Sequence, residues 1–413
     1  MAALALTVSV GGCGVLGGDS GRVSLRLVAA DYGDSAANSS TKYWATLVEA
    51  YEKKHPDVDV EVSVYSWNDV DAKVKAMVDA GDAPDMAQIG SYADYAAEDR
   101  LYPASDLLSI PVQADFVAQL GNAGKVQGQQ YGMPFAASTR LLFYNKALFE
   151  RAGVRTAPTT WDELASAAEK LKEADVKYPY ALPLGPEEAQ AEAMQWMLSG
   201  GGGYTTTAGT YSLDSTENVQ TFTWLKDNLV DKGLTGPVAP AKLNRATAFT
   251  AFAAGDVGML IGHPSLMRAA QDKGVRYGMV PMPGRSGVRP LTMGVADWMT
   301  AFKQHNHQDE IGEFLDFVYS EENVLTFSRT YDLLPVTSSA SAAMSAAPSD
   351  RPLEPFLEEL PLAQLYPAGR TSWSTVAASI KQGIGAAVAP DADPESILRS
   401  LETKAMAAES GLS

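Results

Sequence analysis

Aromatic and polar side chains directly follow each of the first three segments that the sequence predicts as strands. They are Asp31 and Tyr32 after residues 23–29, Trp67 after residues 58–64, and Ser91 and Tyr92 after residues 86–89. An aromatic ring can stack on the flat C–H face of a sugar ring, while carboxylates and hydroxyls form hydrogen bonds with the sugar hydroxyls. These residues are therefore candidates for binding a small polyol, although Asp31 could equally cap the next turn.

Strands and helices alternate around these candidates. Residues 44–51 carry apolar side chains at helical spacing, and residues 58–64 alternate strictly between apolar and polar. A second helix is predicted over residues 70–78, before the short strand at 86–89. This alternation is typical of a parallel sheet, whose ligand loops lie at the carboxyl ends of its strands, so we expect the candidates to meet at one edge.

A second unit of the same kind begins in the middle of the chain. Thr160 and Glu163 form a capping box, residues 311–318 have a helical pattern, and Asp393 with Pro394 predicts the start of a last helix. Residues 338–349, rich in Ala and Ser, are interpreted as a connector. Because 413 residues are too many for one ordinary core, the sequence predicts an α/β protein of two lobes.

The formal net charge is −18, from 50 acidic and 32 basic residues. A surface this acidic repels phosphate backbones, so we expect no nucleic acid partner. An uncharged ligand is indifferent to that field, which favours a neutral substrate. A local basic pocket would still be compatible with the same net charge.

The single cysteine, Cys13, follows a short apolar run from Ala2 to Val10. The run is too short to span a bilayer but suits the core of an export signal. Val10-Gly11-Gly12-Cys13 resembles a bacterial lipobox, in which the cysteine is lipidated, although no Lys or Arg precedes the run. We expect residues 1–22 to be a lipoprotein signal remnant and tether, with Cys13 lipidated (palmitate included) and the anchor as the only membrane contact.

Several segments together resemble one known family. The most specific reads LFYNKALF from Leu142 to Phe149 and continues to PTTWDEL at Pro158–Leu164; weaker segments are Gly81–Asp85, Tyr131–Pro134 and Phe252–Met259, where Asp256 and Gly258 replace the usual Lys and Ala. They are similar to family 1 of the bacterial extracellular solute-binding proteins, carbohydrate-binding lipoproteins of ABC importers related to maltose-binding protein.

The resemblance implies two α/β lobes, joined by chain crossovers, that close by a hinge motion on a ligand in the cleft between them. We expect the first lobe to hold residues 23–136 and 292–333, and the second to hold residues 137–291 and 334–413. The protein would bind a mono- or oligosaccharide at the outer face of the cell membrane and deliver it to permease subunits. It would act as a monomer without a cofactor.

The resemblance also implies further cleft residues. These are Arg140 beside the first crossover, Glu188 and Gln190 at the start of a helix, His263 at the family's GPW turn, Asp297 and Trp298 after a Met-Gly pair, and Arg370 and Trp373 near Tyr366. Arg140 would bind the ligand or tie the lobes together. For Glu188 a solvated helix start, and for His263 a structural role, are equally open.

Two alternatives compete with a sugar receptor. An enzyme is disfavoured because the chain has no GxSxG, HExxH or Walker motif, and His305 with His307 gives only two potential metal ligands, so no metal site is expected. A glycoside hydrolase would need two carboxylates on either side of a bond, which a sequence does not show. The other alternative keeps the fold but binds a peptide, polyamine or metal chelate.

Overall fold

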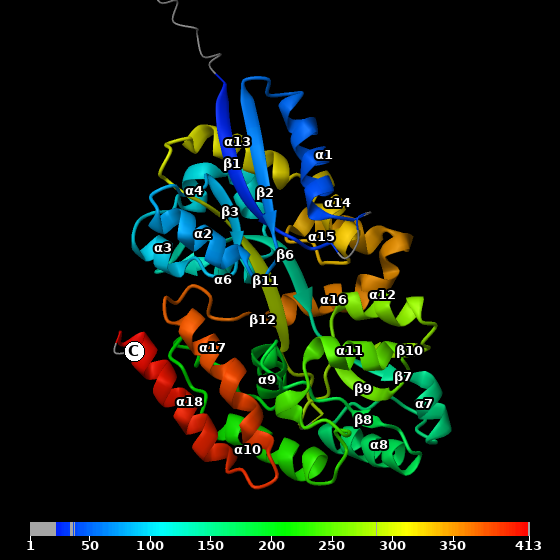
Figure 1. The fold of residues 1–413 in the computed structure, drawn as a ribbon. Coiled ribbons are helices and arrows are strands. Elements are labelled where there is room, and N and C mark those ends of the chain that lie inside the picture. The colour runs from blue at the N-terminus through cyan, green and yellow to red at the C-terminus, as the bar shows by residue number, and fades with distance from the viewer. Residues whose placement is uncertain (1–21, 34–35, 37, 286, 412–413) are drawn as a thin grey trace, which may run out of the picture.

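The computed structural model describes residues 22–33, 36, 38–285 and 287–411. Figure 1 shows two lobes, one above the other, with the C-terminal end of the chain on the lower one. We call the upper half, built around a six-stranded sheet, the first lobe, and the lower half, built around a four-stranded sheet, the second lobe. The predicted two-lobed α/β fold is therefore confirmed. Cys13 and the expected signal segment lie outside the described residues.

The elements have the following bounds. The first sheet contains β1 (Val23–Ala30), β2 (Val58–Tyr65), β3 (Met86–Ile89), β6 (Met133–Thr139), β11 (Thr292–Ala301) and β12 (Ala363–Gln364). The second contains β7 (Leu141–Asn145), β8 (Tyr178–Tyr180), β9 (Val257–Gly262) and β10 (Tyr277–Val280), and β4 (Lys125–Val126) pairs with β5 (Gln129–Gln130). The helices are α1 (Ser40–Glu52), α2 (Val70–Asp79), α3 (Ala93–Ala97), α4 (Ala104–Leu107), α5 (Ile110–Asp115), α6 (Ala118–Ala123), α7 (Lys146–Arg151), α8 (Trp161–Glu173), α9 (Ala189–Ser199), α10 (Thr216–Leu225), α11 (Arg245–Ala253), α12 (Pro264–Asp272), α13 (Gln308–Val318), α14 (Glu321–Tyr331), α15 (Ser338–Ala346), α16 (Glu354–Glu359), α17 (Trp373–Gly383) and α18 (Pro394–Glu409).

The first sheet begins with the parallel strands that the alternating pattern predicts. β1 pairs in parallel with β2 and with β3, while α1 and α2 form the connections. The predicted strand at residues 86–89 is found with the same bounds. Trp44 on α1 and Trp161 on α8 are each only 1% exposed, as expected for core residues.

Helix caps form where the sequence signals them. The Thr160 hydroxyl accepts a hydrogen bond from the Glu163 backbone N–H (3.2 Å), and Asp393 caps α18 by accepting from Glu395 N–H (3.2 Å). The Glu163 carboxylate reaches back to Thr159 N–H (2.7 Å), one residue earlier than in the usual box. The local signals therefore determine where these helices start.

The expected connector at residues 338–349 is instead largely the helix α15. Its Ala-rich sequence has high helix propensity. Its first turn is capped from another element, because the Asp115 carboxylate accepts from Ser339 N–H at 2.9 Å. That long-range contact is invisible in the local sequence, so the interpretation as a connector was wrong.

Two long strands carry the chain between the lobes. β6 of the first sheet ends at Thr139 and β7 of the second begins at Leu141, while β11 pairs with β6 and starts beside the second lobe (Figure 1). The chain meets β6 again where Leu334 N–H donates to the Ala137 carbonyl (2.8 Å). α15 then packs against α14 of the first lobe, although it falls within the range 334–413 expected for the second.

Candidate ligand-binding cleft

Three of the predicted residues meet on one wall of the first lobe. The Tyr32 hydroxyl, just beyond β1, donates a hydrogen bond to Asp297 Oδ2 at 3.1 Å. The Trp67 ring, just beyond β2, meets Tyr32 edge to face with ring centroids 5.5 Å apart. The ends of two parallel strands and the middle of β11 thus place an aromatic pair beside a carboxyl group.

The pairing of β11 with β6 is interrupted by a β-bulge in β6, opposite Asp297 and Trp298. Ala136 of β6 pairs with Asp297, but Pro134 pairs with Trp298, so Phe135 is an extra residue in β6. Proline has no backbone N–H to donate, and strands tolerate it at such irregular positions. Trp298 is only 2% exposed and packs edge to face on Tyr92 at 5.6 Å, so the structure places it in the core behind the wall.

Burial raises the pKa of Asp297 from its usual value to about 7. The hydrogen bond from Tyr32 opposes that rise, whereas the charges of Asp71 and Glu188 add to it. Glu188 belongs to the second lobe, so carboxyl groups of the two lobes lie close enough to interact. Near neutral pH the Asp297 carboxyl can therefore either donate or accept a hydrogen bond.

Asp71 is a carboxylate of this region that the sequence analysis missed. It lies in the first turn of α2, four residues after Trp67, and its Oδ1 accepts from Gly90 N–H at 2.9 Å. Burial raises its pKa. Asp71 could have been predicted from the sequence, because it is an acidic residue at the start of the helix that follows the Trp67 loop.

The other candidates of the first lobe take part in local structure. Asp31 accepts from Gly33 N–H at 3.0 Å and Ser40 N–H at 3.4 Å, which is the turn-capping role. Tyr92 is 0% exposed, and its hydroxyl donates to the Ala123 carbonyl at 3.4 Å. Ser91 is exposed.

The second lobe contributes a charged wall in which four residues are linked. Arg140 donates to Glu188 Oε1 at 2.7 Å, and Arg245 of α11 pairs with the other Glu188 oxygen and with Glu187. His263 Nε2 lies 3.4 Å from an Arg245 nitrogen. Burial lowers the pKa of His263 and the charges of Arg140 and Arg245 lower it further, so the ring is neutral there. Arg140, Glu188, Arg245 and His263 line a small shared cavity.

Glu192 lies behind this wall and was also missed by the sequence analysis. It is 6% exposed and accepts from Trp196 Nε1–H at 3.0 Å and from the Tyr180 hydroxyl at 3.4 Å. Burial raises its pKa to about 8. Residues 191–199 of α9 are all buried, so the helix has no single apolar stripe in the sequence against which the burial of Glu192 could have been predicted.

An aromatic platform adjoins the charged wall. The rings of Tyr366 and Trp373 are stacked with centroids 5.1 Å apart, and Tyr204 packs on Trp373 at 5.7 Å. Within the described part of the chain, the Tyr366 hydroxyl and Gln190 Oε1 are buried, and although the two side chains lie close enough to interact, neither atom has a well-aligned hydrogen-bond partner. Buried polar atoms without partners cost free energy, which makes them typical of a site that a ligand or water completes.

Arg370 is turned away from this platform toward the C-terminal helix. Its guanidinium donates to both oxygens of Glu409 (3.2 and 2.6 Å) and to the Gly209 carbonyl (2.6 Å). It also lies over the Tyr211 ring. In this conformation its N–H groups therefore hold surrounding segments together.

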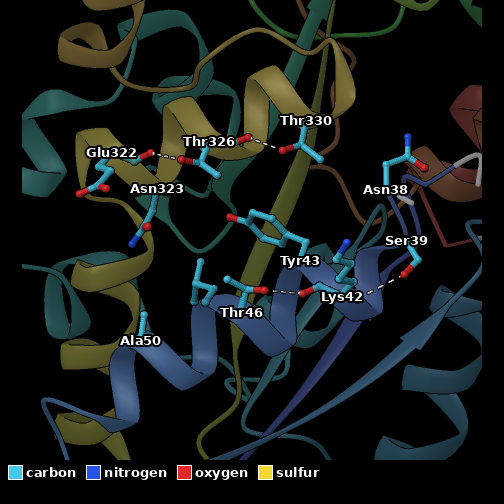
Figure 2. Close-up of a pocket in the computed structure, with 11 residues that line it drawn as sticks. Asn38, Ser39, Lys42, Tyr43, Thr46, Ala50, Glu322, Asn323, Thr326 and Thr330 are labelled. Carbon is cyan, nitrogen blue, oxygen red and sulfur yellow. Dashed lines mark hydrogen bonds between the residues drawn. The ribbon is translucent and has the colours of Figure 1, made fainter. Parts of the chain in front are cut away.

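Two grooves flank these walls. One, of about 570 Å³, is lined by α6 and the β4–β5 turn of the first lobe, by Thr205 and Gly209 of the second lobe, and by the segment from Ala363 that carries Tyr366 and Arg370. The other, of about 390 Å³, lies between α1 and α14 of the first lobe, where Figure 2 shows Tyr43 and Thr46 facing Thr326. None of the predicted site residues lines the second groove, whereas the first opens beside the aromatic platform.

No helix in the described ranges is long and apolar enough to cross a membrane. Nowhere in those same ranges do three or more His, Cys, Asp or Glu side chains gather as a metal site would require. His307, one of the two spaced histidines, instead pairs with Asp85 at 3.0 Å.

Two lobes with opposed polar and aromatic walls define the class: a protein that holds a small ligand between its halves. Residues 37–325 match the family described as bacterial extracellular solute-binding protein, and the chain belongs to that family. The family is one of binding proteins, and the resemblance inferred from the YNK-to-TWDE run is confirmed.

Individual relatives agree with this assignment. A binding protein of Brucella abortus (strain 2308) is 26% identical over 394 residues, covering 94% of this chain and 93% of the relative. The maltotriose-binding protein of Pyrococcus abyssi is 26% identical over 246 residues, covering 58% of this chain and 50% of the relative. The crystal structure of the cyclic α-maltosyl-1,6-maltose binding protein from Arthrobacter globiformis has a TM-score of 0.81 at 22% identity, covering 95% of this chain and 100% of that one, and shows the shared fold.

Proposed function

We propose that this chain binds a neutral mono- or oligosaccharide between its lobes and delivers it to the permease of an ABC importer. The observation that carries the proposal is the stacked pair of Tyr366 and Trp373 rings, beside which the buried Tyr366 hydroxyl and Gln190 Oε1 form no well-aligned hydrogen bond although the two side chains lie close together. A sugar would stack on such a ring and satisfy such atoms with its hydroxyls. Relatives named for binding maltotriose, arabino-oligosaccharides and diacetylchitobiose support the same ligand class.

The charges of the second lobe's wall also favour a neutral ligand. Arg140 and Arg245 are paired with Glu187 and Glu188, so the second lobe offers no excess of either charge. A polyamine would need unpaired carboxylates, and an anion would need unpaired arginines. Neither condition holds among these four residues.

A thermal-shift screen followed by calorimetry tests the proposal. The panel is maltose, maltotriose, cellobiose, diacetylchitobiose, mannitol, spermidine, a tripeptide and free amino acids. We expect one or more sugars to raise the melting temperature, because a ligand that binds only the folded state stabilises it. A shift with spermidine or the tripeptide alone would overturn the sugar assignment. Enzyme-like hydrolysis of an oligosaccharide would overturn the receptor.

We also propose that the protein is a monomeric lipoprotein held at the outer face of the cell membrane by Cys13. The support is the lipobox-like Val10–Cys13 sequence and the extracellular family. A Cys13→Ser variant, expressed in the native host, should move from the detergent phase of a phase-separation assay to the aqueous phase. Equal partition of both proteins would contradict the anchor, and light scattering at twice the monomer mass would contradict the monomer.

A further inference from the structure

Arg140 occupies the single position between the two sheets on the first crossover. β6 ends at the residue before it and β7 begins at the residue after it. Its backbone carbonyl accepts a hydrogen bond from Thr292 Oγ1 at 3.1 Å, and Thr292 is the first residue of β11, the other crossover. The main chain of Arg140 therefore joins the two strands that connect the lobes.

The side chain of Arg140 leads from this junction to the wall of the second lobe. Only 7% of the side chain is exposed, and its Nη2 donates to Glu188 Oε1 at 2.7 Å. Glu188 is the residue that precedes α9, and its other oxygen pairs with Arg245. Because Arg140 is almost fully buried and Arg245 pairs only with the other oxygen, the place of Glu188 Oε1 depends on Arg140.

A second contact ties α9 to the same junction. Gln195, in the middle of α9, is 0% exposed, and its Oε1 accepts from Met293 N–H at 2.9 Å. It also lies 3.2 Å from Thr292 Oγ1, whose single hydroxyl proton is shared between Gln195 Oε1 and the Arg140 carbonyl. The start and the middle of α9 are thus both linked to the crossovers. Any bending of these strands during lobe closure is passed to the helix that presents Glu188 and Gln190.

We propose that Arg140 is a positioning residue for sugar binding: from the crossover it holds the Glu188 carboxylate in the orientation that the ligand meets. This inference depends on the proposed function. Arg140 acts through Glu188 in this scheme and needs no contact with the sugar itself. The neighbouring Arg245 pairs with the second oxygen, so both carboxylate oxygens are directed by guanidinium groups.

The test is a double-mutant cycle with the best-binding sugar of the panel above. Arg140→Met and Glu188→Gln should each weaken binding by about 30-fold, since truncating one partner of a buried charged pair has an effect of that order. The double variant Arg140→Met/Glu188→Gln should bind about as weakly as Glu188→Gln alone, because residues that act as one unit are not additive. Arg140→Lys keeps the positive charge and should therefore recover part of the affinity that Arg140→Met loses. It also disturbs the buried site less than Arg140→Met, so it tests the positioning role even if Arg140→Met folds poorly.

Arg276→Met is the matched control. Arg276 also forms two hydrogen bonds with a carboxylate, that of Glu150, but both side chains are about 60% exposed and lie outside the two walls. We expect its affinity for the sugar to equal that of the wild-type protein.

Three outcomes separate the inference from the proposed function. Unchanged affinity in Arg140→Met overturns the positioning role alone. Fully additive losses in the double variant overturn it as well, because they would mean that Arg140 contacts the sugar independently of Glu188. Failure of the wild-type protein to bind any sugar of the panel overturns the proposed function, and this inference with it.

Discussion

The hydroxyl of Tyr366 is a buried polar atom, and its effects on the free energy of unfolding and on sugar affinity can be measured separately. In the described part of the chain it has no well-aligned hydrogen bond, although Gln190 lies close to it, and its ring is stacked against Trp373. Tyr51 on α1 has a hydroxyl in the same condition, but its ring packs on His55 and Phe314, away from both walls. The two tyrosines thus form a natural pair for comparison.

We predict that Tyr366→Phe raises the free energy of unfolding by about 1 kcal/mol and weakens sugar binding by about tenfold. Removing an unsatisfied hydroxyl relieves a desolvation penalty, while one lost hydrogen bond to the ligand has an effect of that order. Urea unfolding and calorimetry measure the two effects. Tyr51→Phe should show the gain in stability without the loss of affinity; equal affinity in both variants would place the ligand away from Tyr366.

Asp297 makes stability depend on pH in a direction that follows from its raised pKa. Burial raises that pKa to about 7, so between about pH 4 and pH 7 the folded protein keeps a proton that the unfolded chain has lost. Stability therefore falls as pH rises through this window and levels off above it. The cost reaches about 4 kcal/mol at most, because each unit of pKa difference corresponds to about 1.4 kcal/mol.

We predict that Asp297→Asn removes this slope. The variant should have nearly the stability of the wild-type protein at about pH 4 and should be more stable than it at about pH 8, because the amide carries no charge to bury. Urea unfolding at the two pH values gives the comparison. Parallel pH profiles of the two proteins would show that the Asp297 carboxyl ionises as freely when folded as when unfolded.

At the scale of elements, the last turn of α18 supports the loop that carries the aromatic platform. Glu409 binds Arg370 through both oxygens and also accepts from the Ser372 hydroxyl, directly before Trp373. The Tyr211 hydroxyl is hydrogen-bonded to Ser372 at 2.9 Å. The C-terminal helix thus fixes the entry to α17, on which Trp373 is the first residue.

We predict that Glu409→Gln weakens sugar binding by about fivefold while the circular dichroism spectrum stays unchanged. A partly exposed charged pair of good geometry contributes about 1 kcal/mol, which corresponds to that ratio. Glu395→Gln, which breaks the exposed pair with Arg399 on the same helix, is the control and should leave affinity unchanged. Restored binding in the exchanged pair Arg370→Glu/Glu409→Arg would support the role of Glu409 in positioning the platform. A larger loss of affinity in Glu395→Gln than in Glu409→Gln would contradict that role.

At the scale of the whole molecule, the two walls belong to separate lobes that are joined by a few crossover segments. Asp297 stands on β11 of the first lobe, and Glu188 precedes α9 of the second. A ligand that contacts both walls favours the arrangement in which they are close, since closure is governed by its differential affinity for the two states.

We predict that a saturating sugar of the panel reduces the radius of gyration measured by small-angle X-ray scattering. The decrease should be absent with a sugar that gives no thermal shift. It should also be smaller in Trp373→Ala, where one wall loses its aromatic surface. Identical scattering curves with and without a bound sugar would mean that binding occurs without a change in lobe arrangement.

The local sequence determined the elements, the two-lobed class and the family. Strand period, helical spacing and capping residues are short-range signals, and they placed β1, β2, β3, α2 and the starts of α8 and α18. The YNK-to-TWDE run identified the family because it is a contiguous segment. Strand ends also located Tyr32 and Trp67, since parallel strands direct their carboxyl ends to one edge.

Only the tertiary structure decided which candidates face the ligand walls and what supports them. Asp297 and Trp298 are adjacent on β11 and so point to opposite faces of the sheet, and only the packing of the sheet shows that the face of Trp298 is the buried one. Arg370 turns to Glu409, 39 positions away, and α15 depends on Asp115 for its cap. Asp71 and Glu192 acquire raised pKa values through burial. These outcomes depend on contacts between residues distant in the chain, and neither spacing nor composition encodes such contacts locally.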